Sequence, residues 1–128
     1  MGLRLLIVDD NASFVETSRD ILHGGELTVV GGANTAAEAV ERAEELRPDL
    51  VLLDIDLGGE SGFDVARRLA GLSPVPPKII LISGHAADDF AEMVEESPAL
   101  GFVGKADLSA SAIHELLRSH DGPEPDPL

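Results

Sequence analysis

The sequence predicts an α/β protein, a doubly wound, five-stranded parallel sheet covered by five helices. Five short apolar runs of strand length alternate with five segments whose apolar residues recur at helical spacing. Leu50–Leu53 is apolar at every position, as a central strand buried on both faces is. Alternating strands and helices joined by right-handed crossovers place helices on both faces of a parallel sheet.

The predicted strands are runs of four to six residues rich in Leu, Ile and Val. The strand that begins at Leu27 should end before Gly31–Gly32, and the fourth strand follows a stiff, proline-rich loop at Ser73–Pro77. The natural strand order is flavodoxin-like, 2-1-3-4-5, with a switch point between the first and third strands. The strands are expected at Leu3–Val8, Leu27–Val30, Leu50–Leu53, Lys78–Ser83 and Leu100–Gly104.

The predicted helices are marked by end signals as well as by apolar spacing. Gly24–Gly25 closes the first helix, and Thr35 with Glu38 fits a capping box that opens the second. Pro48 follows the second helix and leads into the central strand. The helices are expected at Phe14–Leu22, Ala36–Leu46, Gly62–Leu72, Asp88–Glu96 and Ser109–Ser119.

Composition limits the function classes. The lack of cysteine excludes disulfides and thiolate metal sites. Acidic residues outnumber basic ones 24 to 9, and the formal charge of −15 repels nucleic-acid phosphates, so direct nucleic-acid binding by this domain is not expected. Such a surface is better suited to divalent cations or basic partners.

Length and hydropathy predict one domain without membrane contact. A chain of 128 residues can bury a core of its own. No apolar run approaches the ~20 residues of a membrane span, and the N-terminus lacks a signal-peptide layout, so a cytoplasmic location is expected. Residues 1–119 form the predicted domain, and the proline-rich, acidic residues 120–128 form a tail or linker.

Polar side chains stand at the carboxyl ends of four predicted strands. In chain order they are Asp9, Asp10, Asp54, Ser83 and Lys105. Because the carboxyl ends of parallel strands line the ligand crevice, this fold brings all five to one rim. A lone Asp after a strand commonly only opens a turn, but the joint occurrence at successive strand ends favours a functional site.

The acidic cluster of Asp9, Asp10 and Asp54 suits a divalent metal. Neighbouring carboxylates repel one another, which raises their pKa values unless a cation joins them. Oxygen ligands without His or Cys favour a hard ion, Mg²⁺ or Mn²⁺ in its place. A metal with open positions, an ammonium and a hydroxyl around one carboxylate are typical of phosphoryl transfer. Asp54 is therefore the predicted nucleophile, with Lys105 neutralising charge on the phosphoryl oxygens.

Five short motifs follow one another through the chain at characteristic spacing. They are Val8-Asp9-Asp10-Asn11, Asp49-Leu50-Val51-Leu52-Leu53-Asp54, Gly62-Phe63-Asp64, Ile82-Ser83-Gly84 and Gly101-Phe102-Val103-Gly104-Lys105. Together they resemble the receiver domain of bacterial two-component response regulators, which is CheY-like, and the resemblance covers about Leu3–Ser119.

This resemblance implies a signalling role for the acidic cluster. Asp54 would accept a phosphoryl group from the phosphohistidine of a sensor histidine kinase. The domain would not be an enzyme beyond self-phosphorylation from small donors and slow self-dephosphorylation. Mg²⁺ would be bound directly by Asp10 and Asp54, through water by Asp9, and by the backbone carbonyl of Asp56.

The resemblance also implies a switch. Lys105 would pair with the acyl phosphate, Ser83 would turn to hydrogen-bond it, and Phe102 would turn inward behind Ser83. The signalling surface would comprise the fourth helix, the last strand and the last helix. It would control an output domain or a partner protein, and phosphorylation could also produce a homodimer.

The chain departs from the usual receiver pattern at several positions. Ala106 follows Lys105 where receivers usually carry Pro, so this loop either stores strain or takes another path. Leu57–Gly59 lacks the usual Pro, which indicates a more flexible rim. Phe102 lacks the hydroxyl of the Tyr found in some relatives, so its switch would depend on packing, and simple core filling is the alternative. His85, two residues beyond Ser83, is a candidate to tune hydrolysis.

Three other functions compete with this interpretation. Asp54-Ile55-Asp56 resembles the nucleophile motif of haloacid dehalogenase-type phosphatases, but those enzymes place it on their first strand and are usually longer. A flavodoxin-like FMN binder would need aromatic partners for the flavin, and the chain has no Trp or Tyr. A phosphate-independent pseudo-receiver is disfavoured by the complete acidic set.

Overall fold

The structure is a computed structural model that describes residues 3–23, 27–72, 75–84 and 91–121. Its main sheet has the strand order β2-β1-β3-β6-β7, and all neighbouring strands pair in parallel. Numbered along the chain within this sheet, that order is the predicted 2-1-3-4-5, which is confirmed. The strands are β1 (Leu3–Val8), β2 (Leu27–Ala33), β3 (Leu50–Asp54), β6 (Lys78–Ser83) and β7 (Gly101–Gly104).

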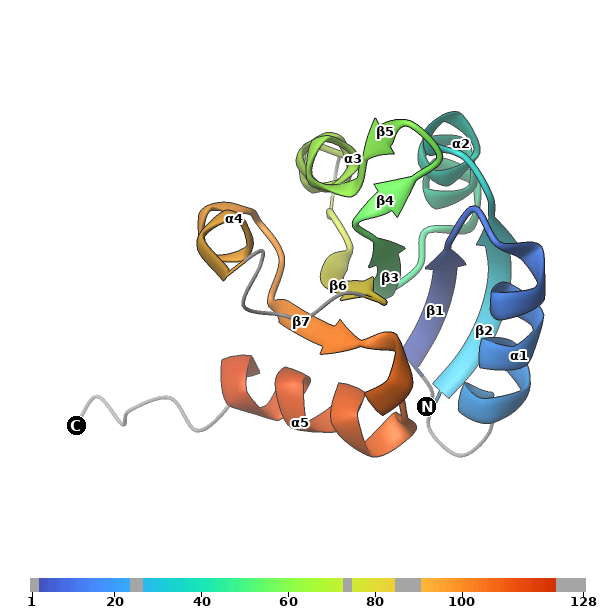
Figure 1. Ribbon diagram of the computed structural model, residues 1–128, viewed down its shortest axis with the longest axis vertical. Coiled ribbons are helices and arrows are strands. Elements are labelled where there is room, and N and C mark those ends of the chain that lie inside the picture. The colour runs from blue at the N-terminus through green and yellow to red at the C-terminus, as the bar shows by residue number, and fades with distance from the viewer. Residues whose placement is uncertain (1–2, 24–26, 73–74, 85–90, 122–128) are drawn as a thin grey trace.

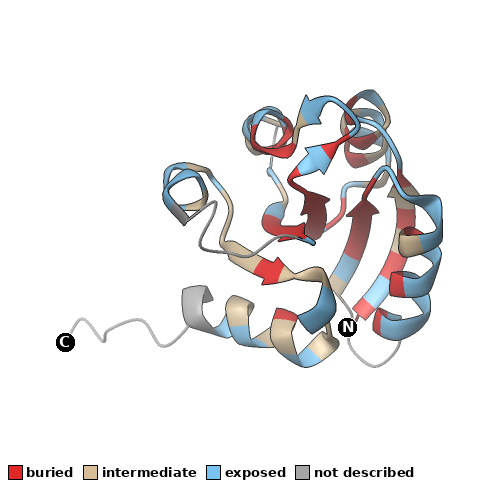
Figure 2. Ribbon diagram, viewed as in Figure 1, coloured by how far each residue is buried: buried red, intermediate tan, exposed pale blue. Residues whose placement is uncertain are grey.

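Helices cover both faces of the sheet (Figure 1). One apolar cluster joins Leu50 and Leu52 to α1 and α5, and the other joins Val51 and Leu53 to α2, α3 and α4. Successive residues of β3 therefore face opposite layers, and the whole strand is buried (Figure 2). The helices are α1 (Ala12–Leu22), α2 (Ala36–Leu46), α3 (Gly62–Ala70), α4 (Ala91–Glu96) and α5 (Ala110–Asp121).

β2 is longer than predicted, because it continues through Gly31 and Gly32 to Ala33. A Cβ at Gly31 would lie 2.8 Å from Leu46 Cδ1, and a Cβ at Gly32 would lie 2.7 Å from Val15 Cγ1. The predicted strand end was wrong because the glycine pair was interpreted as a turn. The glycines instead allow helix side chains to approach the strand backbone closely.

A small hairpin that was not predicted follows β3. β4 (Asp56–Leu57) pairs antiparallel with β5 (Glu60–Ser61) around Gly58 and Gly59. These glycines have φ of 56° and 102°, and a two-residue turn with positive φ at both positions matches the twist of the paired strands. The segment is thus a paired hairpin, and the greater flexibility expected for this rim stays a prediction. Proline could not replace Gly58 in it, because proline fixes φ near about −65°.

Two helix starts are explained by side-chain caps. Asn11 caps α1, since its Oδ1 accepts the Phe14 N–H at 3.2 Å, and the helix begins at Ala12 rather than at Phe14. Thr35 caps α2 as predicted, with its Oγ1 accepting the Glu38 N–H at 3.1 Å. The Glu38 carboxylate accepts the N–H of Asn34 at 2.8 Å, so the box closes one residue further out than expected.

Several predicted features lie outside the described residues: the Gly24–Gly25 helix stop, the first residues of the helix predicted at Asp88–Glu96, His85, and residues 122–128 of the tail. α5 continues to Asp121, beyond its predicted end at Ser119. The division between domain and tail stays a prediction. None of the helices in the described ranges has the length and apolar character of a membrane span.

Candidate functional site

The candidate site lies at the carboxyl edge of the sheet, where four strands end side by side. Asp9 directly follows β1, and Asp54 is the last residue of β3. Ser83 is the last residue of β6, and Lys105 directly follows β7. Because β3 lies between β1 and β6, the carboxylate of Asp54 stands at the centre of this edge.

Three carboxylates meet at this edge. Asp9, Asp10 and Asp54 each offer an oxygen, and these oxygens lie within 4.8 Å of one another. Asp9 is fully buried and Asp54 is only 4% exposed, whereas Asp10 is exposed. The structure therefore brings together the three acids that the sequence placed at one rim.

Lys105 bridges the two buried acids. Its ammonium lies 2.7 Å from Asp9 Oδ2 and donates a hydrogen bond to Asp54 Oδ2 at 3.2 Å. Lys105 begins a 3₁₀ turn, η2 (Lys105–Asp107), in which Ala106 is exposed. Among the described non-glycine residues, only Arg47 has a positive φ, so the loop after Lys105 is free of that form of backbone strain.

Backbone N–H groups hold one oxygen of each buried acid. Asp9 Oδ1 accepts the N–H of Asn11 at 2.9 Å, and Asp54 Oδ1 accepts the N–H of Asp56 at 3.1 Å. Asp9 Oδ2 is buried and lacks an aligned hydrogen-bond donor in the described part of the chain, although the Lys105 ammonium lies at ion-pair distance. A carboxylate oxygen has more than one lone pair, so Asp9 Oδ2 could interact with a second cation beside the Lys105 ammonium.

The site shifts the pKa values of Asp54 and Lys105 in the same direction. Burial raises the pKa of Asp54 above its ordinary 3.8, and the Asp9 charge adds to the rise, while the Asp56 N–H and Lys105 oppose it. Burial alone would lower the pKa of Lys105, but Asp9 and Asp54 raise it above 10.5. The ammonium therefore stays charged at neutral pH, and ionised Asp54 is held at a cost in desolvation.

The donor set fits a hard divalent cation. Its oxygens come from three carboxylates, one of them with a buried oxygen that lacks an aligned donor. Asp9, Asp10 and Asp54 are the residues that would hold Mg²⁺. For Asp56, the described contact is made by its N–H, so the role of its backbone carbonyl as a ligand stays a prediction.

The two predicted switch residues lie on neighbouring strands. Ser83 is 2% exposed and helps to line a hollow of about 420 Å³ together with Asp56, Phe63 and Met93. Phe102 is half-buried and packs against the apolar cluster on the α2 and α3 face. This contact is the core-filling alternative, and a switching role for both residues stays a prediction.

Two residues at this edge were not predicted as part of the site. Asn11 links α1 to Asp9, and the ring centroid of Phe14 lies 4.5 Å from Lys105 Nζ. The sequence offered one signal for both, their place within four residues of the acidic pair and at the start of a helix. It offered none for the contact with Lys105, which is remote along the chain.

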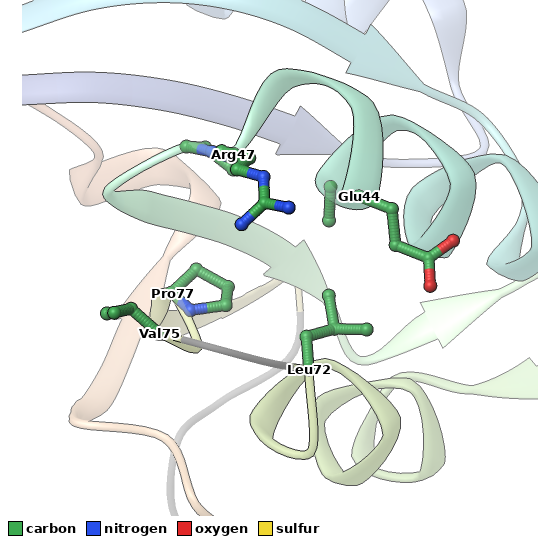
Figure 3. A pocket seen from close by; sticks show the side chains of 7 residues that line it. Glu44, Arg47, Leu72, Val75 and Pro77 are labelled. Carbon is green, nitrogen blue, oxygen red and sulfur yellow. The ribbon is translucent and has the colours of Figure 1, made fainter.

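A separate hollow of about 290 Å³ lies at the opposite edge of the sheet, where β3 and β6 begin (Figure 3). Glu44 and Arg47, at the end of α2, line it together with Leu72, Val75 and Pro77. None of the acids of the site contributes to it, so it belongs to a different part of the surface.

Comparison with known proteins shows the family. The chain belongs to the response regulator receiver domain family, whose model matches residues 5–118. The solved receiver domain of the putative response regulator NarL from Mycobacterium tuberculosis is similar, with 28% identity and a TM-score of 0.81 over 95% of this chain and 98% of that one. The response regulator domain of Thermotoga maritima CheB has 26% identity and a TM-score of 0.79, over 98% of this chain and all of that one (100%).

Two relatives similar to this chain are longer proteins. The DNA-binding response regulator MtrA of Mycolicibacterium paratuberculosis is 38% identical over 96% of this chain and 55% of its own length. Protein-glutamate methylesterase/protein-glutamine glutaminase 5 of Myxococcus xanthus is 32% identical over 89% of this chain and 33% of its own length. This chain thus spans about a third to about half of these relatives and corresponds to their receiver portion.

Proposed function

We propose that Asp54 accepts a phosphoryl group from the phosphohistidine of a sensor histidine kinase, with Mg²⁺ at the acidic cluster. The observation that carries the proposal is the arrangement around Asp54. This carboxylate is buried at the centre of the carboxyl edge, 3.2 Å from the Lys105 ammonium and within 4.8 Å of oxygens from Asp9 and Asp10. Membership of the receiver family supports a phosphoacceptor that acts in signalling rather than in catalytic turnover.

The chain's own residues would prepare the acceptor and its product. An Asp54 carboxylate oxygen attacks phosphorus, the P–N bond to the kinase imidazole breaks, and its electron pair returns to the imidazole nitrogen. The Asp56 N–H holds the other oxygen of Asp54, which orients the carboxylate. Lys105 neutralises the transferred phosphoryl group. Bound Mg²⁺ would supply further charge neutralisation for the phosphoryl oxygens.

The output would pass through the surface formed by α4, β7 and α5. Ser83 would turn toward the acyl phosphate, and Phe102 on β7 would follow it inward. The partner would be an output domain, a separate protein or a second copy of the chain. The names of MtrA and of the methylesterase indicate different outputs, so neither output is assigned to this chain. A cytoplasmic location stays a prediction.

Phosphorylation by a small donor tests the proposal. Incubation with acetyl phosphate and Mg²⁺ should add one phosphate to the intact protein, detected by mass spectrometry. Asp54→Asn should abolish the addition, whereas Asp20→Asn, which changes an exposed acid on α1, should retain it. Uptake by Asp54→Asn at the wild-type rate would exclude Asp54 as the acceptor. If Asp54 is confirmed as the acceptor, phosphotransfer from a panel of histidine kinases would identify the kinase that donates the phosphoryl group.

A phosphatase acting through Asp54 and Asp56, the alternative that the sequence left open, is not favoured by membership of the receiver family. The exposed carboxylate of Asp56 stands two residues beyond the buried Asp54, as the phosphatase motif requires. The motif follows the third strand of the chain rather than the first, which is unlike those enzymes. Catalytic turnover of a small phosphate ester, with many products per protein molecule, would favour the phosphatase over the receiver.

A further inference from the structure

An aromatic ring faces the cation of the candidate site. The ammonium of Lys105 lies 4.5 Å from the centroid of the Phe14 ring. A cation at this distance is attracted by the negative face of the ring. An ammonium has three N–H donors, and among the described residues the oxygens near this one belong to Asp9 and Asp54. Phe14 thus supplies a third contact that comes from neither acid.

The Phe14 backbone is tied to the acidic cluster by a short chain of hydrogen bonds. Asp9 Oδ1 accepts the N–H of Asn11, and Asn11 Oδ1 accepts the N–H of Phe14 at 3.2 Å. The side chain is half-buried and packs against the apolar cluster between α1 and α5. The first turn of α1 therefore holds the ring beside the same carboxylate that Lys105 contacts.

The acids that now hold Lys105 are those that would bind a metal. When Asp54 holds a divalent cation directly and Asp9 holds it through water, their attraction for the ammonium weakens and the two positive charges repel each other. An aromatic face attracts the ammonium but is no ligand for a hard, oxygen-seeking ion. The Phe14 contact therefore persists when the carboxylate contacts weaken.

We infer that Phe14 is a positioning residue, whose ring keeps the Lys105 ammonium beside Asp54 while the acids bind metal. This inference rests on the proposed phosphoacceptor function. The alternative is that Phe14 only fills space between α1 and α5. The two roles differ in what Phe14→Leu does, since leucine keeps apolar bulk but loses the ring, whereas Phe14→Tyr keeps both.

Lysine-selective labelling makes the contact directly observable. The chain contains two lysines, Lys105 and Lys78, and Lys78 begins β6 at the opposite edge of the sheet. In protein labelled with ¹³C-lysine, protons of Lys105 near the ring should be shifted upfield by the ring current, and those of Lys78 should not. The shift should be present without metal, persist with saturating Mg²⁺, disappear in Phe14→Leu and return in Phe14→Tyr.

A second experiment measures the rate of Asp54 phosphorylation by acetyl phosphate. Phe14→Leu should lower this rate about five- to tenfold, the size expected from loss of one cation–π contact. The Mg²⁺ affinity should stay within about twofold of the wild type, because the ring is no metal ligand. Phe14→Tyr should restore the rate. Ile113→Val, a change of packing in the same apolar cluster, should leave the rate and the Lys105 signals unaltered.

Several outcomes would overturn this inference. They are an unshifted Lys105 signal in the wild type, loss of the shift when Mg²⁺ binds, an unaltered rate in Phe14→Leu, or a Phe14→Tyr variant as slow as Phe14→Leu. If wild-type protein takes up no phosphate at all, the proposed function fails instead. The labelled Lys105 signals with and without Mg²⁺ then decide by themselves whether the ring holds the ammonium.

Discussion

Replacement of Gly62 by Ala should destabilise the fold, because α3 begins directly against the backbone of Asp54, the proposed phosphoacceptor. A Cβ at Gly62 would overlap the carbonyl oxygen of Asp54 and lie 2.8 Å from Ile55 Cα. It would also lie 3.0 Å from the carbonyl carbon of Asp54. These are backbone atoms at the end of the central strand, so no rotation of a side chain can relieve the overlap. The strand end or the start of α3 must move.

The expected loss follows from three contributions. Overpacking of a tightly packed site costs about 1–3 kcal/mol, and contact with backbone atoms favours the upper part of that range. The N–H of Gly62 donates to the carbonyl of Ile55 at 2.6 Å, and weakening this bond costs about 1 kcal/mol more. The better helix propensity of Ala offsets at most about 1 kcal/mol. The free energy of unfolding should fall by about 2–3 kcal/mol, or roughly 10 °C in Tm.

Urea unfolding followed by circular dichroism measures this loss, since the chain has no Trp or Tyr for fluorescence. The midpoint should fall without a change in the slope m, as expected when the folded state alone is strained. Gly71→Ala is the matched control, because a Cβ there would lie 3.6 Å from the nearest atom, an ordinary contact. A Gly62→Ala protein within about 0.5 kcal/mol of the control would refute the steric argument.

Three further predictions concern the acids. Because burial raises the pKa of Asp54 above 3.8, the metal-free fold loses stability as pH rises from 3.8 to that raised pKa, and the loss is constant at higher pH. Asp54→Asn should therefore raise Tm by a few degrees at pH 7 and leave it unchanged well below pH 3.8, and a lower Tm at pH 7 would contradict this. Asp10→Asn should weaken Mg²⁺ binding at least about threefold more than Asp9→Asn does, because Lys105 already neutralises much of the Asp9 charge. Equal losses of Mg²⁺ affinity in the two variants, measured by calorimetry, would show that Asp10 is not the more important acid. The Asp56→Asn protein should lose the phosphoryl group from Asp54 about two- to fivefold faster at neutral pH and saturating Mg²⁺, because the exposed Asp56 carboxylate repels hydroxide. Slower loss from the variant would show that this carboxylate assists the attacking water.

The sheet and its acidic edge could be predicted because both depend on patterns that are local in sequence. Leu50–Leu53 is apolar at every position, which indicates a central strand, and Asp54 follows it at once. Once the strand order is known, residues at successive strand ends must meet, however far apart they stand in the chain. The predicted meeting of Asp9, Asp54 and Lys105 required no further information.

The features that were missed depend on tertiary contacts. Gly31 and Gly32 have low strand propensity, but β2 continues through them by pairing with β1. Leu46 and Val15 occupy the space that larger side chains would need at these two positions. The ring of Phe14 meets Lys105 only after α1 has packed on the sheet and β7 has joined it. No periodicity or spacing within either segment predicts this contact between the ring and the ammonium.

The hairpin after β3 shows why the rim of this site has glycine where receivers usually carry proline. Gly58 has a φ of 56°, which proline cannot adopt and which side chains of L-residues adopt at a cost. A Cβ at Gly58 would also lie 3.3 Å from Asp10 Oδ2, close enough to crowd the exposed acid of the cluster. Both the backbone conformation and the space beside Asp10 favour glycine at position 58, whereas at position 62 glycine is favoured by space alone. The turn is therefore held by β4–β5 pairing rather than by a fixed proline ring, and glycine at position 58 leaves the Asp10 carboxylate uncrowded.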